Sequence, residues 1–161
     1  MKNVLLTLFL LSFISLKTIA QIPSPVIPEF KFFRMDQSVF TDKDLAKGKK
    51  IFFVFFDPTC DHCQRAMKII GAQYKNFKNA AIYLIAIDSP DKINSFMDKY
   101  GQPLKGKKNI LLLQDKLNQF IVKFKPKKYP SMFLYSAQKK LIAYEDEPEE
   151  INKIIKPLSA K

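Results

Sequence analysis

The stretch FFDPTCDHCQ, residues 55–64, contains both cysteines of the chain and its only histidine. Cys60 and Cys63 are separated by two residues, Asp61 and His62. Two thiols at this spacing can close into a disulfide and open again, and together with the imidazole they could also ligate a metal ion. The chemistry to be decided is therefore thiol–disulfide exchange, metal binding, haem attachment or a structural crosslink.

The surrounding residues argue against three of these four kinds of site. Covalent haem attachment requires a histidine directly after the second cysteine, where this chain has Gln64. A structural zinc site needs four ligands, and the stretch supplies at most three. A structural disulfide between such close neighbours closes a loop too small to add much stability. The sequence therefore favours a redox-active dithiol that uses neither a metal nor a cofactor.

The dithiol lies between an apolar run and a helical pattern. Residues 50–56, KIFFVFF, predict a strand that is buried on both faces. From Cys63 to Phe77 the apolar residues recur every three or four positions, which predicts a helix. Cys60 would then stand at a helix N-terminus, where unpaired N–H groups and the helix dipole stabilise a thiolate. Since the thiolate is the attacking species, this position predicts a reactive thiol.

The rest of the chain alternates between predicted strands and helices, which indicates an α/β fold with a mixed central sheet. Ser89, Pro90 and Gly101 provide the cap, first residue and stop of one helix. We expect strands at 28–33, 80–88 and 109–115 and a hairpin at 130–146, with helices at 42–46, 89–101, 116–124 and 147–158.

Residues 1–20 have the pattern of a signal peptide. Lys2 precedes an apolar run from Val4 to Leu16, and Thr18-Ile19-Ala20 supplies the small residues of a cleavage site. The run is short for a membrane span, although an uncleaved anchor is the alternative. No cysteine lies near the cleavage point, which excludes a lipoprotein anchor. We expect residues 21–161 to form one domain without a stable membrane anchor, periplasmic or secreted, where disulfides persist.

The composition is that of a basic globular protein, with 47% hydrophobic residues, 26% charged residues and a net charge of +12. Such a charge could indicate binding to nucleic acid or to an anionic membrane. The lysines, however, form short clusters beside Gly or Pro, at 47–50, 105–108 and 125–128. Arginine, the better phosphate ligand, occurs only at Arg34 and Arg65. We therefore expect solvated lysines and no nucleic-acid partner.

Two segments resemble conserved blocks of the thioredoxin-fold proteins of the bacterial envelope, the TlpA/ResA-like and AhpC/TSA group. Residues 35–63 have the layout of a β-hairpin, a short turn, a core strand and the CxxC pair, and residues 111–142 place a proline before a hairpin. The resemblance extends over about residues 28–158. It implies a thioredoxin-like three-layer α/β/α sandwich with a mixed central sheet and an N-terminal β-hairpin extension.

The resemblance also implies roles for individual residues. Cys60 matches the attacking thiol and Cys63 the resolving thiol, while Pro130 matches a cis-proline that faces the disulfide and Tyr129 the residue before it. A cis X–Pro bond exposes the preceding backbone, which can pair with an extended substrate segment. A trans proline opening an edge strand is the alternative for Pro130. The partners would be protein disulfides or dithiols, together with a redox partner that the sequence does not identify.

Other residues near the pair depart from the family pattern. Val54 stands where plain thioredoxins carry a buried acid, and Thr59 where they carry a tryptophan. Asp57 could act as a nearby base or simply cap a turn.

His62 and Asp61 act on the redox poise in opposite directions. A protonated or donating imidazole would stabilise the Cys60 thiolate, whereas Asp61 would repel it. The alternative for His62 is a solvated ring without influence. The lost acid at Val54 and the added imidazole predict a more oxidising pair than that of thioredoxin.

The function predicted from the sequence is that of a monomeric envelope thiol–disulfide oxidoreductase. Two alternatives remain. One is a non-enzymatic module of the same fold that binds a metal or a partner's cysteine in a redox-dependent way. The other is a thiol peroxidase-like redoxin, although peroxidase members lack the adjacent second cysteine.

Overall fold

Seven strands form a single mixed sheet within residues 22–159, the part of the chain that the computed structural model describes. The predicted signal peptide, residues 1–20, lies outside the described residues. The strand order across the sheet is β2-β1-β5-β4-β3-β6-β7, which places the strand before the dithiol well inside the sheet. The strands are β1 Lys31–Arg34, β2 Val39–Thr41, β3 Ile51–Phe55, β4 Ala81–Ala86, β5 Ile110–Gln114, β6 Ser131–Tyr135 and β7 Leu141–Glu145.

Strand β3 carries the chain to the dithiol and is buried along its whole length. It pairs in parallel with β4 and antiparallel with β6, so both of its backbone edges are hydrogen-bonded. Successive residues alternate between two apolar layers, with Phe52 on one face of the sheet and Phe53 on the other. The prediction of a strand buried on both faces is confirmed, because each face of the sheet is covered.

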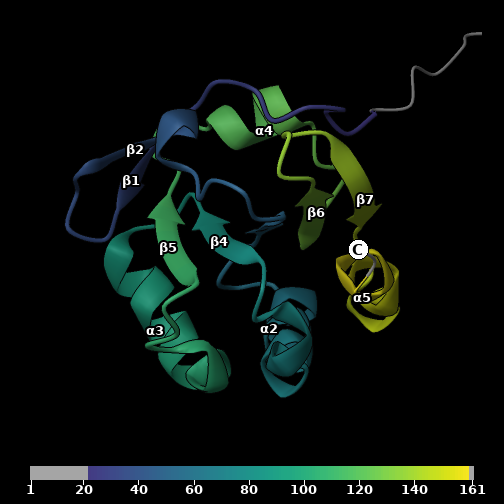
Figure 1. Ribbon diagram of the computed structural model, residues 1–161. Coiled ribbons are helices and arrows are strands. Elements are labelled where there is room, and N and C mark those ends of the chain that lie inside the picture. Colours follow the sequence, from purple (N-terminus) through teal and green to yellow (C-terminus); the bar gives the residue numbers. More distant parts are fainter. Residues whose placement is uncertain (1–21, 160–161) are drawn as a thin grey trace, which may run out of the picture.

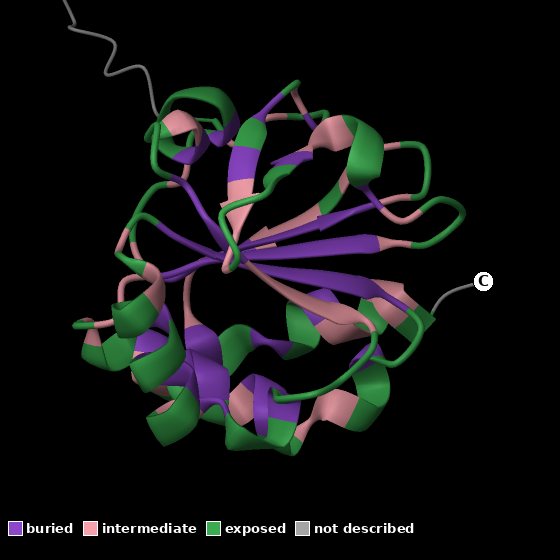
Figure 2. Cartoon of the chain, turned by 90° about the vertical axis from the view of Figure 1, so that its left-hand side faces the viewer, coloured by how far each residue is buried: buried purple, intermediate pink, exposed green. Residues whose placement is uncertain are grey.

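The two faces of the sheet are covered by different helices (Figure 1). Helices α2 (Asp61–Ala72), α3 (Pro90–Tyr100) and α5 (Asn152–Ser159) pack on one face. Helix α4 (Gln119–Phe124) packs on the other, together with the extended segment before β1. Buried strands between two exposed outer layers are evident in Figure 2. The predicted thioredoxin-like three-layer sandwich with a mixed sheet is confirmed.

The N-terminal β-hairpin extends this sheet. β1 pairs antiparallel with β2 and, on its other side, antiparallel with β5. A 3-10 turn, η2 (Asp42–Asp44), follows, and Thr41 and Asp44 form a capping box there. The hairpin extension that the resemblance implied is thus present. The helix predicted at 42–46 is the 3-10 turn at 42–44, and the strand predicted at 28–33 is shifted to 31–34.

Three predicted helices begin or end elsewhere than the pattern indicated. The helix predicted at 116–124 begins only at Gln119, because the preceding residues form a turn and the N-cap residue Asn118 has a left-handed backbone with φ of 52°. The periodicity from Cys63 runs to Phe77, but α2 ends at Ala72 and residues Tyr74–Phe77 form the 3-10 helix η3. The tighter turn brings the Phe77 ring onto that of Phe52, with the centroids 5.2 Å apart. At the C-terminus, η5 (Pro148–Glu150) contains the acidic residues, and α5 begins only at Asn152. A further 3-10 turn, η4 (Gln102–Leu104), follows α3.

Helix α3 has the bounds that the sequence indicated, with Ser89 as its N-cap, Pro90 in its first turn and Gly101 as its C-cap.

In the described part of the chain, no helix combines the length and apolar character that a membrane crossing requires.

Candidate functional site

Cys60 lies where β3 has ended and α2 is about to begin. It is the N-cap residue of α2, with an extended backbone, and its carbonyl accepts the first helical hydrogen bond from Gln64 N–H at 3.1 Å. The thiol is partly exposed, and Cys60 and Cys63 are free cysteines in this structure. The N–H groups of the first helical turn have no partner within the helix, so the N-terminus carries partial positive charge beside the sulfur. This placement, expected from the sequence, puts the partly exposed thiol of Cys60 at the positive end of the helix.

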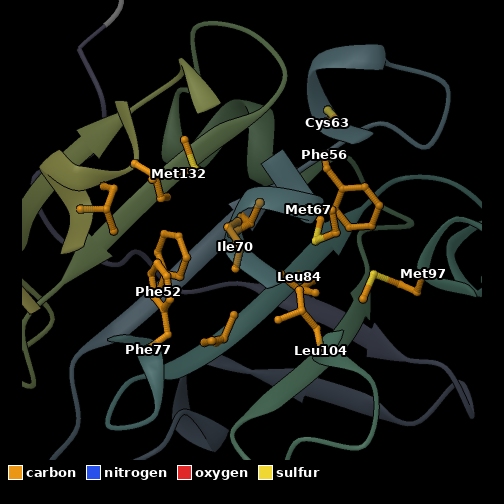
Figure 3. Close-up of a cluster of buried hydrophobic side chains, with 14 of the residues drawn as sticks. Phe52, Phe56, Cys63, Met67, Ile70, Phe77, Leu84, Met97, Leu104 and Met132 are labelled. Carbon is orange, nitrogen blue, oxygen red and sulfur yellow. The ribbon is translucent and has the colours of Figure 1, made fainter. Parts of the chain in front are cut away.

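Cys63 lies one turn into α2 and has no exposed surface. It belongs to the apolar cluster that also contains Phe56 and Met67, as Figure 3 shows. The backbone N–H of Asp57 donates to Cys63 Sγ over 3.4 Å. Burial raises the pKa of the Cys63 thiol well above its usual value, and a hydrogen bond with Cys60 raises this pKa further. Cys63 is therefore a protonated, inaccessible thiol while Cys60 remains open to solvent.

The loop before β6 brings a backbone acceptor to Cys60. The carbonyl oxygen of Tyr129 lies 4.0 Å from Cys60 Sγ, although 69 positions separate the two residues. The Tyr129–Pro130 peptide bond is cis, which confirms the prediction for this bond. Ser131 Oγ donates to the carbonyl of Lys128 over 2.7 Å and fixes the loop from the far side of the proline. The tertiary structure thus brings Tyr129 to the reactive sulfur, as the resemblance implied.

The imidazole of His62 contacts Arg65 rather than Cys60. Arg65 Nη2 lies 2.9 Å from His62 Nδ1, and Arg65 Nε lies 3.7 Å from a carboxylate oxygen of Glu149. A guanidinium can only donate, so the imidazole is the acceptor in this contact, and the same Arg65 nitrogen lies 3.4 Å from Nε2 of the ring. The influence expected of His62 on Cys60 stays a prediction, whereas the contact that the structure shows is with Arg65. The cause is local, because residues i and i+3 of a helix are neighbours on its surface.

Asp61 and Asp57 also have defined places. Asp61 is exposed in the first turn of α2, where the helix dipole accommodates its charge. Asp57 Oδ1 accepts hydrogen bonds from Thr59 N–H and Thr59 Oγ1, both at 2.7 Å. Asp57 therefore caps the turn that leads to Cys60, the simpler of its two expected roles. Val54 is fully buried, so no acid occupies that position of the core.

Some residues that shape the site gave no clear signal in the sequence. Lys128 forms a hydrogen-bonded ion pair with Glu147, which ties the proline loop to the segment before α5. Asp115, fully buried, accepts from the N–H groups of Gln119 and Phe120 at 2.9 and 2.7 Å and so anchors the start of α4. Only the Arg65–His62 contact could have been anticipated, from its spacing of three on a helix.

The difference in exposure between the two thiols leads to a first prediction. In the reduced protein, iodoacetamide should alkylate Cys60 more than about a hundredfold faster than Cys63, because Cys63 is both inaccessible and protonated. Peptide mapping by mass spectrometry after short labelling times measures the two rates. A control in denaturant should give nearly equal rates, and equal labelling of the native protein would contradict the assignment of Cys60 as the accessible thiol.

A second prediction concerns pH. In a Cys60→Ser variant the burial of Cys63 remains, so its pKa stays raised and its thiolate fraction stays small at neutral pH. The alkylation rate of Cys63 should then rise about tenfold for each pH unit, without a plateau up to about pH 9, since the thiolate is the reacting species. Stopped samples at half-unit intervals give the profile. A plateau near pH 8.5 would mean that burial does not perturb this thiol.

The composition of the site also bears on metal binding. Within residues 22–159, no group of three or more His, Cys, Asp or Glu side chains is arranged to hold a metal ion. His62 faces Arg65, which leaves the two sulfurs without the third ligand that the sequence offered.

Comparisons with known proteins agree with this geometry. Residues 24–144 match the family described as the AhpC/TSA family. Over 99 aligned residues, the chain is 25% identical to the thiol-disulfide oxidoreductase ResA of Bacillus subtilis (strain 168). The aligned residues cover 60% of this chain and 52% of ResA. The chain thus spans about half the length of the curated relative that it matches.

Solved structures share the fold at low sequence identity. The thioredoxin domain of a thiol-disulfide oxidoreductase from Bacteroides vulgatus superposes with a TM-score of 0.65 at 17% identity, covering 87% of this chain and 100% of that one. Peroxidoxin BcpB from Mycobacterium tuberculosis gives a TM-score of 0.69 at 13% identity, covering 88% and 98%. These two neighbours are named for different reactions, so the likeness shows the fold alone.

The family match covers most of the chain, and the sheet order, the CxxC pair at the start of α2 and the cis-proline loop beside it fit the same assignment. The chain belongs to the AhpC/TSA family of thioredoxin-like proteins.

Proposed function

We propose that this protein is a thiol–disulfide oxidoreductase that exchanges disulfides with protein substrates outside the cytoplasm. The observation that carries the proposal is the asymmetry of the pair. Cys60 is partly exposed at a helix N-terminus, whereas Cys63 is buried one turn away with a raised pKa. One thiol is thus suited to attack a partner and the other to wait in reserve. The predicted signal peptide supports the compartment.

The reaction proceeds in two exchanges. The Cys60 thiolate attacks one sulfur of a substrate disulfide, and the other substrate sulfur leaves as a thiolate that takes a proton from water. Cys63 then loses its proton and attacks Cys60 Sγ, which releases the second substrate thiol and closes the Cys60–Cys63 disulfide. Two electrons pass from the protein dithiol to the substrate, and the reverse sequence oxidises a substrate dithiol. An extended substrate segment that binds to the backbone at Tyr129 and Pro130 would hold the attacked sulfur near Cys60.

Catalysed reduction of insulin disulfides with dithiothreitol as the electron source tests the proposal. The wild-type protein should accelerate insulin precipitation, and a Cys60→Ser/Cys63→Ser double variant should not. Consumption of hydrogen peroxide, monitored in parallel, tests the peroxidase alternative. This alternative is included because the fold is similar to that of peroxidoxin BcpB. Stability that depends on added copper or zinc, without insulin turnover, would instead identify a binding module.

The redox poise gives a third prediction. The pair should have a reduction potential above about −270 mV, the value of thioredoxin, and below about −120 mV. The reason is that Val54, which is fully buried, stands where plain thioredoxins carry a buried acid. Without that negative charge nearby, the reduced thiolate form of the pair is favoured. Equilibration with glutathione buffers measures the potential. A value at or below that of thioredoxin would contradict the argument and favour a dedicated reductase.

Variants on the surface of α2 refine this prediction. Arg65 carries a permanent positive charge, and its guanidinium contacts His62. Because this charge favours the reduced thiolate, Arg65→Gln should lower the reduction potential more than His62→Ala does. Each shift should be no more than about 20 mV, because both side chains are exposed and screened. Asp61→Ala should raise the potential slightly, through removal of a nearby negative charge.

A further inference from the structure

A small groove lies between α4 and the loop before β6, which contains the cis Tyr129–Pro130 bond. It has a volume of about 160 Å³ and is lined by Phe55, Ile121, Pro126, Lys127, Lys128 and Tyr129. Its floor is aromatic, since the Phe55 and Tyr129 rings lie 4.8 Å apart between centroids. A leucine-sized side chain fits such a volume, and burying it there would exchange water for apolar contacts.

The groove is coupled to the reactive sulfur through a single residue. The carbonyl oxygen of Tyr129 lies 4.0 Å from Cys60 Sγ, and the same residue lines the groove. An extended segment that pairs with this backbone places alternate side chains on the same face, about 7 Å apart. A substrate cysteine at Cys60 would therefore set the side chain two positions away at the mouth of the groove.

Helix α4 contributes one apolar residue, Ile121, to the wall of the groove. Asp115 anchors the first turn of the helix, and Phe120 and Phe124 stack with a centroid distance of 4.2 Å beneath it. Ile121, which lines the groove, is nevertheless 41% exposed. An apolar side chain held in place at the surface by buried neighbours is suited to receive another apolar side chain.

The rim of the groove is basic. Lysines occur at positions 123, 125, 127 and 128, and two of them, Lys127 and Lys128, line the groove itself. Lys128 is neutralised by Glu147 and Asp146. Lys127 has its ammonium group over the Tyr144 ring, 5.5 Å from the centroid, and no ion pair of the described residues involves it. Lys127 therefore gives the groove a positive charge that no carboxylate of the described residues pairs, and this charge favours an acidic partner.

We propose that this groove selects the substrate segment. The occupant is an extended polypeptide with a leucine-sized apolar residue two positions from its reactive cysteine and acidic residues beside it. The inference rests on the proposed function, because the same Cys60 performs the exchange. The apolar contact in the groove makes the protein prefer substrate segments with a leucine-sized residue at that position. The positive charge of Lys127 accelerates the encounter with acidic substrate segments.

Peptide mixed disulfides test the inference. Each short peptide carries one cysteine joined to 5-thio-2-nitrobenzoate, whose release is coloured when the Cys60 thiolate of the reduced protein attacks the peptide sulfur. One peptide has leucine two positions from the cysteine and two glutamates nearby, tested with leucine on either side. Its analogues replace leucine by serine, or the glutamates by lysines. The disulfide of the reagent itself, without a peptide, serves as the probe of basic exchange.

The wild-type protein should react about tenfold faster with the leucine peptide than with its serine analogue. Ile121→Ser should reduce this ratio to about twofold, whereas Val122→Ser, on the same helix but 72% exposed and outside the groove, should leave the ratio unchanged. Lys127→Gln should reduce the preference for the glutamate peptide more than Lys78→Gln, a remote exposed lysine of equal charge. The Lys127 effect should fade with added salt.

The outcomes separate this inference from the proposed function. A wild-type ratio near one, or an equal fall in Ile121→Ser and Val122→Ser, would overturn the groove as the selecting site while exchange with the peptide-free reagent persists. A protein that reacts neither with that reagent nor with any peptide would overturn both.

Discussion

Replacement of Cys60 by serine should lower the rate of disulfide exchange by a factor of about 10³ or more. The hydroxyl that replaces the thiol is not ionised near neutral pH, and Cys63 cannot take its place because it has no exposed surface and a raised pKa. Insulin reduction and the reaction with a small aromatic disulfide both measure the loss. The fold should be retained, since Cys60 lies at the start of α2 and is only partly buried.

The matched variant is Cys63→Ser. It should keep the first exchange and lose the second, so a mixed disulfide between Cys60 and the substrate accumulates and is visible on a non-reducing gel. Thiol-free electrophoresis before and after added dithiothreitol distinguishes this covalent complex from aggregation. If Cys63→Ser abolished the first exchange and Cys60→Ser left it intact, the order of the two thiols would be reversed.

Replacement of Phe53 by alanine should destabilise the protein by about 3–5 kcal/mol. Phe53 is fully buried at the centre of β3, where its ring contacts the rings of Phe30, Tyr83, Phe120, Phe124 and Tyr135. Removing it leaves a cavity that close-packed aromatic neighbours on both sides cannot collapse to fill. Urea unfolding followed by circular dichroism measures the change in the free energy of unfolding.

The control is Phe33→Ala, which removes the same side chain from β1, where it is only partly buried and lies near the ammonium groups of Lys31 and Lys116. Its cost should be well below that of Phe53→Ala, because a ring that remains partly hydrated leaves little cavity. Similar losses in the two variants would show that the aromatic cluster on the α4 face is not tightly packed.

The sequence by itself determined the features that depend on local pattern. A run of six apolar residues at 51–56 predicted the buried strand β3, and Ser89, Pro90 and Gly101 defined both ends of α3. The change from a strand period to a helical one placed Cys60 at a helix N-terminus, where the structure has it. These inferences succeeded because the backbone and its near neighbours along the chain decide them.

Features that depend on residues far apart in the sequence required the tertiary structure. The approach of Tyr129 to Cys60 could be expected only from the family resemblance, since nothing in either segment specifies the other. The groove between α4 and the proline loop gave no signal at all, because its six lining residues come from three separate segments. The contact between His62 and Arg65, by contrast, joins neighbours on one helix surface and could have been anticipated from their spacing of three. Contacts between distant residues depend on how the sheet and its two outer layers pack. Local periodicity shows which face of an element is buried, but it does not specify the residues that this face contacts.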